Sequence, residues 1–203
     1  MPDWDQDSPQ LRQNLTRILQ EIAQQAEKRK IPSVEMARRW QTLFMQGLKP
    51  DNPRYIGSFR GEPGLKKTRV KIGTYWGVPP ADVAEELQQF QQKLQAAVVQ
   101  LDKALPVGGE LDTDELAAVT DLCAWAHSEW IRIHPFANGN GRTARLWANF
   151  LAMRYGLPPF IRLRPRPDEG YASAGIKAMQ GDWKPTAIVF RRFLGRFLDE
   201  SGK

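Results

Sequence analysis

Cysteine is nearly absent from this sequence, in which Cys123 is the only one. A lone cysteine cannot form an internal disulfide, so a disulfide-stapled fold is excluded. Cys123 falls in an apolar helical run, which indicates a buried, inert thiol rather than a nucleophile. Histidine is also scarce: the chain has two, His127 and His134, and no Cys or Asp cluster joins them as in a zinc site.

Long hydrophobic runs are missing as well. No apolar stretch is long enough to span a bilayer, so we expect no membrane partner. The first residues are polar and acidic, which argues against a secretory signal peptide, and we expect residues 1–7 to be disordered. These absences together favour a cytoplasmic location.

Positive charge is concentrated in one part of the chain. The segment from Arg132 to Lys203 holds 13 basic and 5 acidic residues, whereas the segment from Met1 to Ile131 holds 16 basic and 18 acidic ones. A basic segment is typical of anion binding, although a solvated surface with excess arginine would look similar. The excess begins at the motif described below, so polyphosphate binding explains it best, and we do not expect nucleic acid as a partner.

Apolar residues recur at helical spacing along most of the chain, so we expect a mainly α fold. Two helices, starting at Ser8-Pro9 and at Ser33, form a predicted N-terminal extension over residues 1–50. A domain over residues 51–203 follows, with core helices at about 80–156 and C-terminal helices at about 168–200. Within it, Asp112 and Glu115 have the spacing of a capping box.

One region has the alternation of β-strands. Residues 55–60 and 68–72 alternate and are separated by a turn-rich Gly-Glu-Pro-Gly stretch. We therefore predict a hairpin over about residues 55–73. An isolated hairpin is marginal, so it should lean on the helical body.

The most informative stretch runs from His134 to Arg145. Pro135 disfavours the α conformation at His134, so the preceding helix should end there and leave the imidazole at a sharp exit. Residues 138–141, Asn-Gly-Asn-Gly, can adopt positive φ at several positions and form a nest of backbone N–H groups that binds anions.

A helix starting near Arg142 would add its free N–H groups and the positive end of its dipole to this nest. Arg142 and Arg145 are three residues apart on that helix, so both can face the same anion. A titratable imidazole beside a phosphate cradle suggests the transfer of part of a nucleotide to a nucleophile. His127 lies seven residues before His134, and we interpret it as a satisfied core or helix-surface histidine outside the site.

These residues resemble the Fic family signature, H-x-F-x-(D/E)-G-N-G-R-x-x-R. The positions that match it are His134, Phe136, Gly139, Asn140, Gly141, Arg142 and Arg145. The resemblance extends over residues 55–198 and implies a Fic-type helical bundle with a small β-hairpin flap. It also implies an enzyme that transfers AMP from ATP to a Ser, Thr or Tyr hydroxyl of a target protein.

The resemblance assigns a role to each matching position. His134 would be the general base, and Phe136 would pack into the core. Gly139, Asn140 and Gly141 would hold the α- and β-phosphates of ATP, and Arg142 and Arg145 its outer phosphates. Four residues at the predicted hairpin would dock the target segment: Thr68, Arg69, Val70 and Lys71. Because lysine on an exposed strand edge also protects against aggregation, that ordinary role is an equal alternative to target docking for this segment.

Asn138 is the one departure, because the family carries an acidic metal ligand there. Mg²⁺ is the expected metal and prefers at least one carboxylate, so an amide oxygen is a poorer ligand. The sequence also has no convincing copy of the family's inhibitory S/T-x-x-x-E-G/N helix, which leaves open a separate inhibitory partner. A homo-oligomer is equally left open.

Three other functions remain at this point. The same fold could transfer UMP, phosphate or phosphocholine, or could remove AMP. The cradle could bind a nucleotide or nucleic acid without chemistry. The stretch could also be an ordinary helix–loop–helix turn, although that would not explain two arginines at phosphate-binding spacing.

Overall fold

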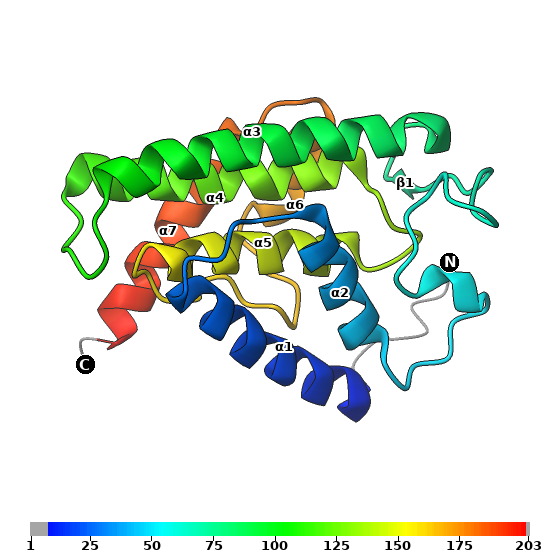
Figure 1. Cartoon of the computed structure of the whole chain (residues 1–203), viewed down its shortest axis with the longest axis horizontal. Coiled ribbons are helices and arrows are strands. Elements are labelled where there is room, and N and C mark those ends of the chain that lie inside the picture. Colours follow the sequence, from blue (N-terminus) through cyan, green and yellow to red (C-terminus); the bar gives the residue numbers. More distant parts are fainter. Residues whose placement is uncertain (1–7, 202–203) are drawn as a thin grey trace.

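The computed structural model describes residues 8–201 as seven α-helices and one two-stranded sheet (Figure 1). The mainly α fold with a small β element is therefore confirmed, whereas the predicted disorder of residues 1–7 lies outside the described range. Within that range, every helix is too short or too polar to cross a bilayer.

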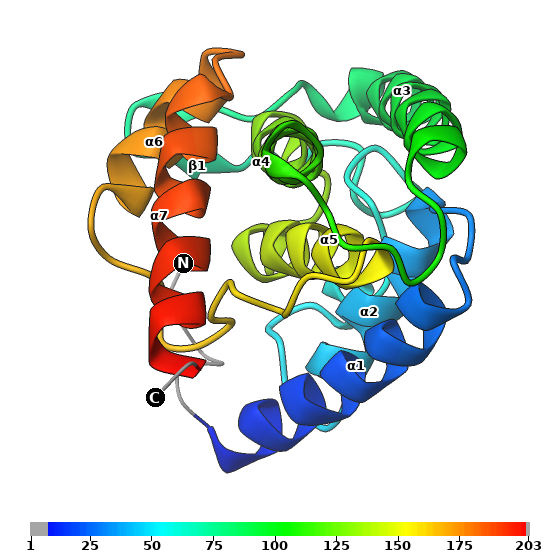
Figure 2. The same ribbon diagram turned by 90° about the vertical axis from the view of Figure 1, so that its left-hand side faces the viewer.

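Two helices, α4 (Thr113–Ile133) and α5 (Asn140–Arg154), form the centre of the molecule (Figure 2). Only Gly141 and Met153 of the 15 residues of α5 keep partial exposure. A helix that is buried all round belongs in a core. The turn between these two helices is the motif that starts at His134, so the fold holds that motif between its two most buried helices.

The N-terminal helices, α1 (Pro9–Glu27) and α2 (Val34–Met45), pack against the same core. Ser8 caps α1 by accepting a hydrogen bond from the backbone N–H of Leu11 at 3.0 Å, whereas Ser33 at the start of α2 makes no such bond. Trp40 of α2 lies edge-on against Trp147 of α5, with ring centroids 4.8 Å apart. These two helices therefore contribute to the same hydrophobic core as α4 and α5.

The remaining helices surround α4 and α5. A 3₁₀ turn, η2 (Pro80–Asp82), leads into α3 (Val83–Ala104), and α6 (Tyr171–Met179) and α7 (Lys184–Ser201) end the described chain. The predicted capping box at the start of α4 is present, with bonds of 2.8 and 2.9 Å between Asp112 and Glu115.

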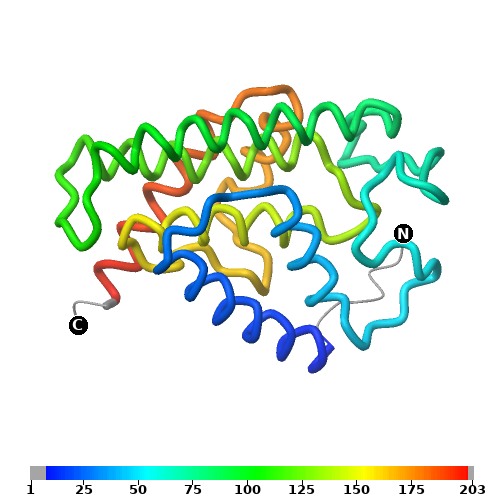
Figure 3. The backbone as a smooth tube through the Cα atoms, in the orientation of Figure 1, coloured from blue at the N-terminus to red at the C-terminus, as the bar shows by residue number. Residues whose placement is uncertain are grey.

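The predicted hairpin is wrong in its position. The sheet pairs β1 (Lys71–Ile72) with β2 (Tyr75–Trp76), and Gly73 takes the positive φ that the turn requires. Residues 55–60 do not pair with 68–72. The segment between α2 and α3, which contains the short sheet, lies at one end of the molecule, as the backbone trace in Figure 3 shows.

Burial explains this difference. Phe59 is buried and forms an isolated bridge with Phe136, their ring centroids 4.8 Å apart. Pro53 begins a 3₁₀ turn, η1 (Pro53–Tyr55), which removes Tyr55 from any strand. Packing of two aromatic rings in the core outweighs a few more ladder bonds at the surface.

Candidate active site

The turn after α4 places His134 in the left-handed region, with φ 54° and ψ 53°. Its N–H still donates to Trp130 O at 2.9 Å, so the helix ends at this residue as predicted. A left-handed conformation is uncommon for a residue other than glycine, so the surrounding contacts must hold it.

The His134 imidazole is buried, with 7% of the residue exposed. Its Nδ1 lies 3.1 Å from the carbonyl oxygen of Ile131. Because a carbonyl can only accept, Nδ1 carries the hydrogen and Nε2 keeps its lone pair. Burial is the main cause that lowers the pKa of His134 to about 4, and the nearby charge of Arg60 acts in the same direction. The hydrogen bond to Ile131 partly opposes this change, because it raises the pKa. The ring is therefore a neutral base at physiological pH.

The loop that follows is fixed by two of its own residues. Phe136 is fully buried, and the Asn140 side chain makes two 2.8 Å hydrogen bonds with the Phe136 backbone N–H and carbonyl. Gly139 has φ 89°, and a Cβ there would lie 2.3 Å from the Phe44 ring. Only glycine fits this position.

The predicted anion nest contains fewer residues with a positive φ than the sequence indicated. Of residues 138–141, Gly139 alone has a positive φ, because Asn140 and Gly141 join the first turn of α5, which begins two residues earlier than predicted. A helix start leaves its first N–H groups without partners in the helix. The cradle is therefore one glycine turn followed by a helix N-terminus, an arrangement that favours anions.

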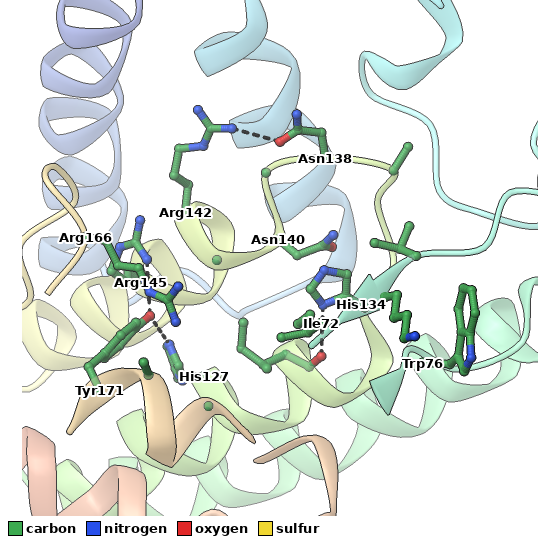
Figure 4. A pocket seen from close by; sticks show the side chains of 18 of the residues that line it. Ile72, Trp76, His127, His134, Asn138, Asn140, Arg142, Arg145, Arg166 and Tyr171 are labelled. Carbon is green, nitrogen blue, oxygen red and sulfur yellow. Dashed lines mark hydrogen bonds between the residues drawn. The ribbon is translucent and has the colours of Figure 1, made fainter. Parts of the chain in front are cut away.

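Arg142 and Arg145 lie on this first stretch of α5 and are both buried. Arg142 Nη2 donates to Asn138 Oδ1 at 3.0 Å, and its guanidinium lies 4.8 Å from the centre of the Phe44 ring. Arg145 donates from Nη1 to the Tyr171 hydroxyl at 3.2 Å and from Nη2 to Leu163 O at 3.0 Å. Figure 4 shows the two groups on different sides of the helix start, within one pocket.

That pocket has a volume of about 690 Å³. It brings together His134, the cradle and a set of cations, and the lining residues that the structure describes include no Asp or Glu. The cations come from the hairpin, from α5 and from the connector before α6: Arg69, Lys71, Arg142, Arg145, Arg164 and Arg166. Such a lining favours a polyanionic ligand.

Three of the four predicted flap residues reach this pocket: Arg69, Val70 and Lys71. Thr68 is not among the described lining residues, and its carbonyl accepts a hydrogen bond from Arg60 Nη1 at 3.4 Å. The exposed ring of Trp76 on β2 also lines the pocket, under the guanidinium of Arg69 at 4.5 Å.

His127 and Tyr171 form a part of the pocket that the sequence analysis missed. The Tyr171 hydroxyl lies 2.7 Å from His127 Nε2. The same oxygen accepts a hydrogen bond from Arg145 Nη1 at 3.2 Å, so the Tyr171 hydroxyl links the imidazole to the guanidinium. Burial lowers the pKa of His127 to about 3, and the charges of Arg145 and Arg166 add to the effect.

His127 is buried, as the sequence predicted, and its Nε2 is hydrogen-bonded to Tyr171. Its Nδ1 has no partner among the described residues and the residue lines the pocket, so the prediction of a satisfied histidine outside the site was wrong. The sequence did contain one signal that could have placed His127 in the site, its spacing of seven residues from His134. Seven residues are close to two helical turns, so both side chains lie on the same face of α4.

The residues present do not fit a magnesium site built from protein ligands. The side-chain oxygen of Asn138 already contacts a guanidinium, and a metal ion there would meet another cation. In the described part of the chain, no group of three or more His, Cys, Asp or Glu residues could hold a metal ion.

Comparison with known proteins agrees with this geometry. A family model described as the Fic/DOC family matches residues 31–152. Protein adenylyltransferase fic-1 of Caenorhabditis briggsae is 33% identical over 146 residues, covering 68% of this chain and 26% of that protein. Protein adenylyltransferase Fic of Drosophila grimshawi is 33% identical over 130 residues, covering 64% and 23% respectively. The chain thus spans about a quarter of the length of these relatives.

Two crystal structures share the fold. One is a Fic domain containing signaling protein from Bacteroides thetaiotaomicron, with a TM-score of 0.65, 19% identity, and coverage of 92% of this chain and 69% of that one. The other is the BepC protein of Bartonella tribocorum with bound AMPPNP, with a TM-score of 0.53, 19% identity, and coverage of 90% and 85%.

Proposed function

The chain belongs to the Fic/DOC family, and on that basis we propose that it transfers AMP from ATP to a Ser, Thr or Tyr hydroxyl of a target protein. The curated relatives carry the name protein adenylyltransferase. A protein of the same fold was crystallised with AMPPNP, an ATP analogue. Both facts support ATP as the substrate.

The observation that carries the proposal is the state of His134. It is a buried, neutral imidazole with a free Nε2 lone pair, in the same pocket as Arg142 and Arg145. A base with this tautomer can accept a proton from a hydroxyl brought into the pocket.

In the proposed reaction, Gly139, Asn140 and Gly141 hold the α- and β-phosphates by backbone N–H groups. Arg142 and Arg145 bind the outer phosphates. His134 Nε2 takes the proton of the target hydroxyl, whose oxygen forms a bond to the α-phosphorus. The bond between that phosphorus and the bridging oxygen breaks, and pyrophosphate leaves. Positioning and electrostatic stabilisation supply most of the acceleration.

The target segment would dock at the hairpin. The backbone of Thr68–Lys71 leads into β1 at the pocket rim, and residues 54–71 include six basic residues and one acidic one. An extended segment that pairs with this edge would bring its hydroxyl towards His134. The proposal also includes a separate inhibitory partner, because the sequence has no convincing copy of the family's inhibitory helix, and self-association.

Magnesium would enter with ATP, held by phosphate oxygens and water, because residue 138 offers only an amide oxygen. The alternatives on the same fold are transfer of UMP, phosphate or phosphocholine, and removal of AMP. The experiment is incubation of the chain with ATP labelled at the α-phosphate and a cell lysate, with His134→Ala beside it. Labelled protein in the wild-type sample alone is expected, and mass spectrometry of the product identifies the added group. Equal labelling in both samples would contradict the proposal.

A further inference from the structure

Arg60 is a buried cation outside the motif that contacts the turn of the catalytic base. It is 1% exposed. Its Nε donates to His134 O at 2.7 Å and its Nη2 to Ile133 O at 2.9 Å. The backbone N–H of the same residue donates to Pro135 O at 2.7 Å. One arginine therefore binds three consecutive carbonyls around His134.

The chemistry of these carbonyls explains why an arginine is suited to this place. The last carbonyls of a helix lack intrahelical partners and carry the negative end of its dipole. Ile133 and His134 end α4, so their oxygens need donors, and a cation is favoured there. The planar guanidinium presents several N–H groups in a fixed geometry, which a lysine ammonium cannot do.

Arg60 also connects this turn to the segment that leads into the hairpin. Its Nη1 reaches Thr68 O at 3.4 Å, just before β1. At the other end of the hairpin, the Gly77 N–H donates to Val70 O at 3.1 Å. A Cβ on Gly77 would lie 2.7 Å from His134 Cβ and 3.1 Å from Arg60 Nη2. The hairpin base therefore lies directly against the catalytic turn.

We propose that Arg60 is a positioning residue that holds the left-handed turn of His134 and fixes it relative to the hairpin. This inference rests on the proposed transfer reaction, in which His134 must meet a hydroxyl carried by a segment docked at the hairpin. The Arg60 side chain would therefore position both the His134 imidazole and the hairpin that carries the hydroxyl substrate.

The charge of Arg60 supports the same role. None of the salt bridges in the described part of the chain involves Arg60, and its partners are backbone carbonyls. Burial lowers its pKa to about 10, so it stays charged at neutral pH. A positive charge beside the ring opposes protonation of His134 and keeps the base ready.

The test compares Arg60→Lys and Arg60→Met with Arg154→Lys as a matched control. Arg154 is also buried, but it binds Lys30 O and Asp102 at the far end of α5. For Arg60→Lys we expect kcat for AMP transfer to fall on the order of 100-fold, as a small misplacement of a reacting group does. AMPPNP affinity, measured by calorimetry, should change less than about threefold, because a loss confined to the base leaves ground-state binding intact.

Two further measurements separate positioning from a purely structural role. In Arg60→Met, the acid limb of the pH–rate profile should move to higher pH, because the charge that disfavours imidazolium is gone. The NMR resonances of the His134 ring should shift in both Arg60 variants, while those of His127 stay in place. The chain has only these two histidines, so the signals are easily assigned.

The NMR comparison does not need activity, so it tests the role of Arg60 even if the wild-type chain transfers no AMP. Unchanged His134 resonances in the Arg60 variants, or a loss of kcat no larger than in Arg154→Lys, would overturn the proposal. If the Arg60 variants do not fold, Gly77→Ala probes the same contact from the hairpin side. Reduced kcat with intact AMPPNP binding would then support the proposal, and full activity would overturn it.

Discussion

The Asn138 side-chain oxygen accepts a hydrogen bond from Arg142 Nη2 at 3.0 Å. An amide at this position therefore orients Arg142, which we propose to bind phosphate, and offers no charged ligand to a metal. Asn138→Asp should strengthen the contact with Arg142, because charge-assisted hydrogen bonds are stronger, and should also supply the carboxylate that Mg²⁺ prefers. We expect this variant to need less magnesium for half-maximal AMP transfer.

The measurement is a magnesium titration of transfer by both proteins. Asn52→Asp is the matched control, since Asn52 caps the η1 turn, and its half-maximal magnesium concentration should match that of the wild type. An unchanged magnesium requirement in Asn138→Asp would mean that residue 138 does not approach the metal.

Replacement of His134, the proposed base, gives the largest predicted loss. General-base catalysis is worth about 100- to 10,000-fold, so His134→Ala should reduce transfer by that factor while AMPPNP still binds. The proposed reaction needs a neutral His134, and burial lowers the pKa of His134 to about 4. The rate should therefore stay level from pH 8 to about pH 5 and fall only near pH 4. An acid limb at the ordinary histidine value, about 6.5, would contradict this environment for His134.

The Tyr171 hydroxyl orients Arg145, so its removal should weaken ATP binding. Tyr171→Phe leaves Arg145 Nη1 without this acceptor and His127 Nε2 without its hydrogen-bond partner. A hydrogen bond to a charged group contributes roughly 1.5–3 kcal/mol, so we expect the Kd for AMPPNP to rise about 10-fold or more. Tyr75→Phe is the matched control, because the Tyr75 hydroxyl binds exposed Gln180 on the hairpin side. Equal affinities in the two variants would show that Tyr171 does not position Arg145.

The features that the sequence predicted correctly are local ones. The helix end before Pro135, the buried Phe136 and the capping box at Asp112 each depend on residues within four positions of one another. Gly139 was predicted as a turn residue, and its φ of 89° and the Phe44 ring show why no side chain fits there.

The features that the sequence missed depend on contacts between distant segments. Phe59 pairs with Phe136 across 77 positions, which removed residues 55–60 from the predicted hairpin. In the sequence, Arg60 is one of several cations in a basic segment and has no sign of burial. In the structure it is buried and donates a hydrogen bond to His134 O. Tyr171 reaches Arg145 only because α6 packs against α4, and no spacing pattern in the chain indicates that approach.

The two histidines also predict how stability depends on pH. Burial lowers the pKa of His127 to about 3 and of His134 to about 4, whereas an unfolded histidine titrates near 6.5. Protons therefore bind the unfolded chain first as the pH falls. The contribution of both neutral rings to stability is complete above about pH 6.5 and declines below it, until it is lost near the folded pKa values. Between about pH 6.5 and pH 5, each ring should lower the free energy of unfolding by roughly 2 kcal/mol, since each pH unit corresponds to about 1.36 kcal/mol.

Urea unfolding at pH 7.5 and pH 5.0 measures this loss. Ordinary Asp and Glu pKa values lie near 4, below most of this window, so the histidines should dominate the change. His134→Ala removes one of the two rings and should therefore lose about half as much stability between the two pH values. A wild-type chain equally stable at both would mean that both rings accept a proton inside the fold, and a protonated His134 could not act as the base.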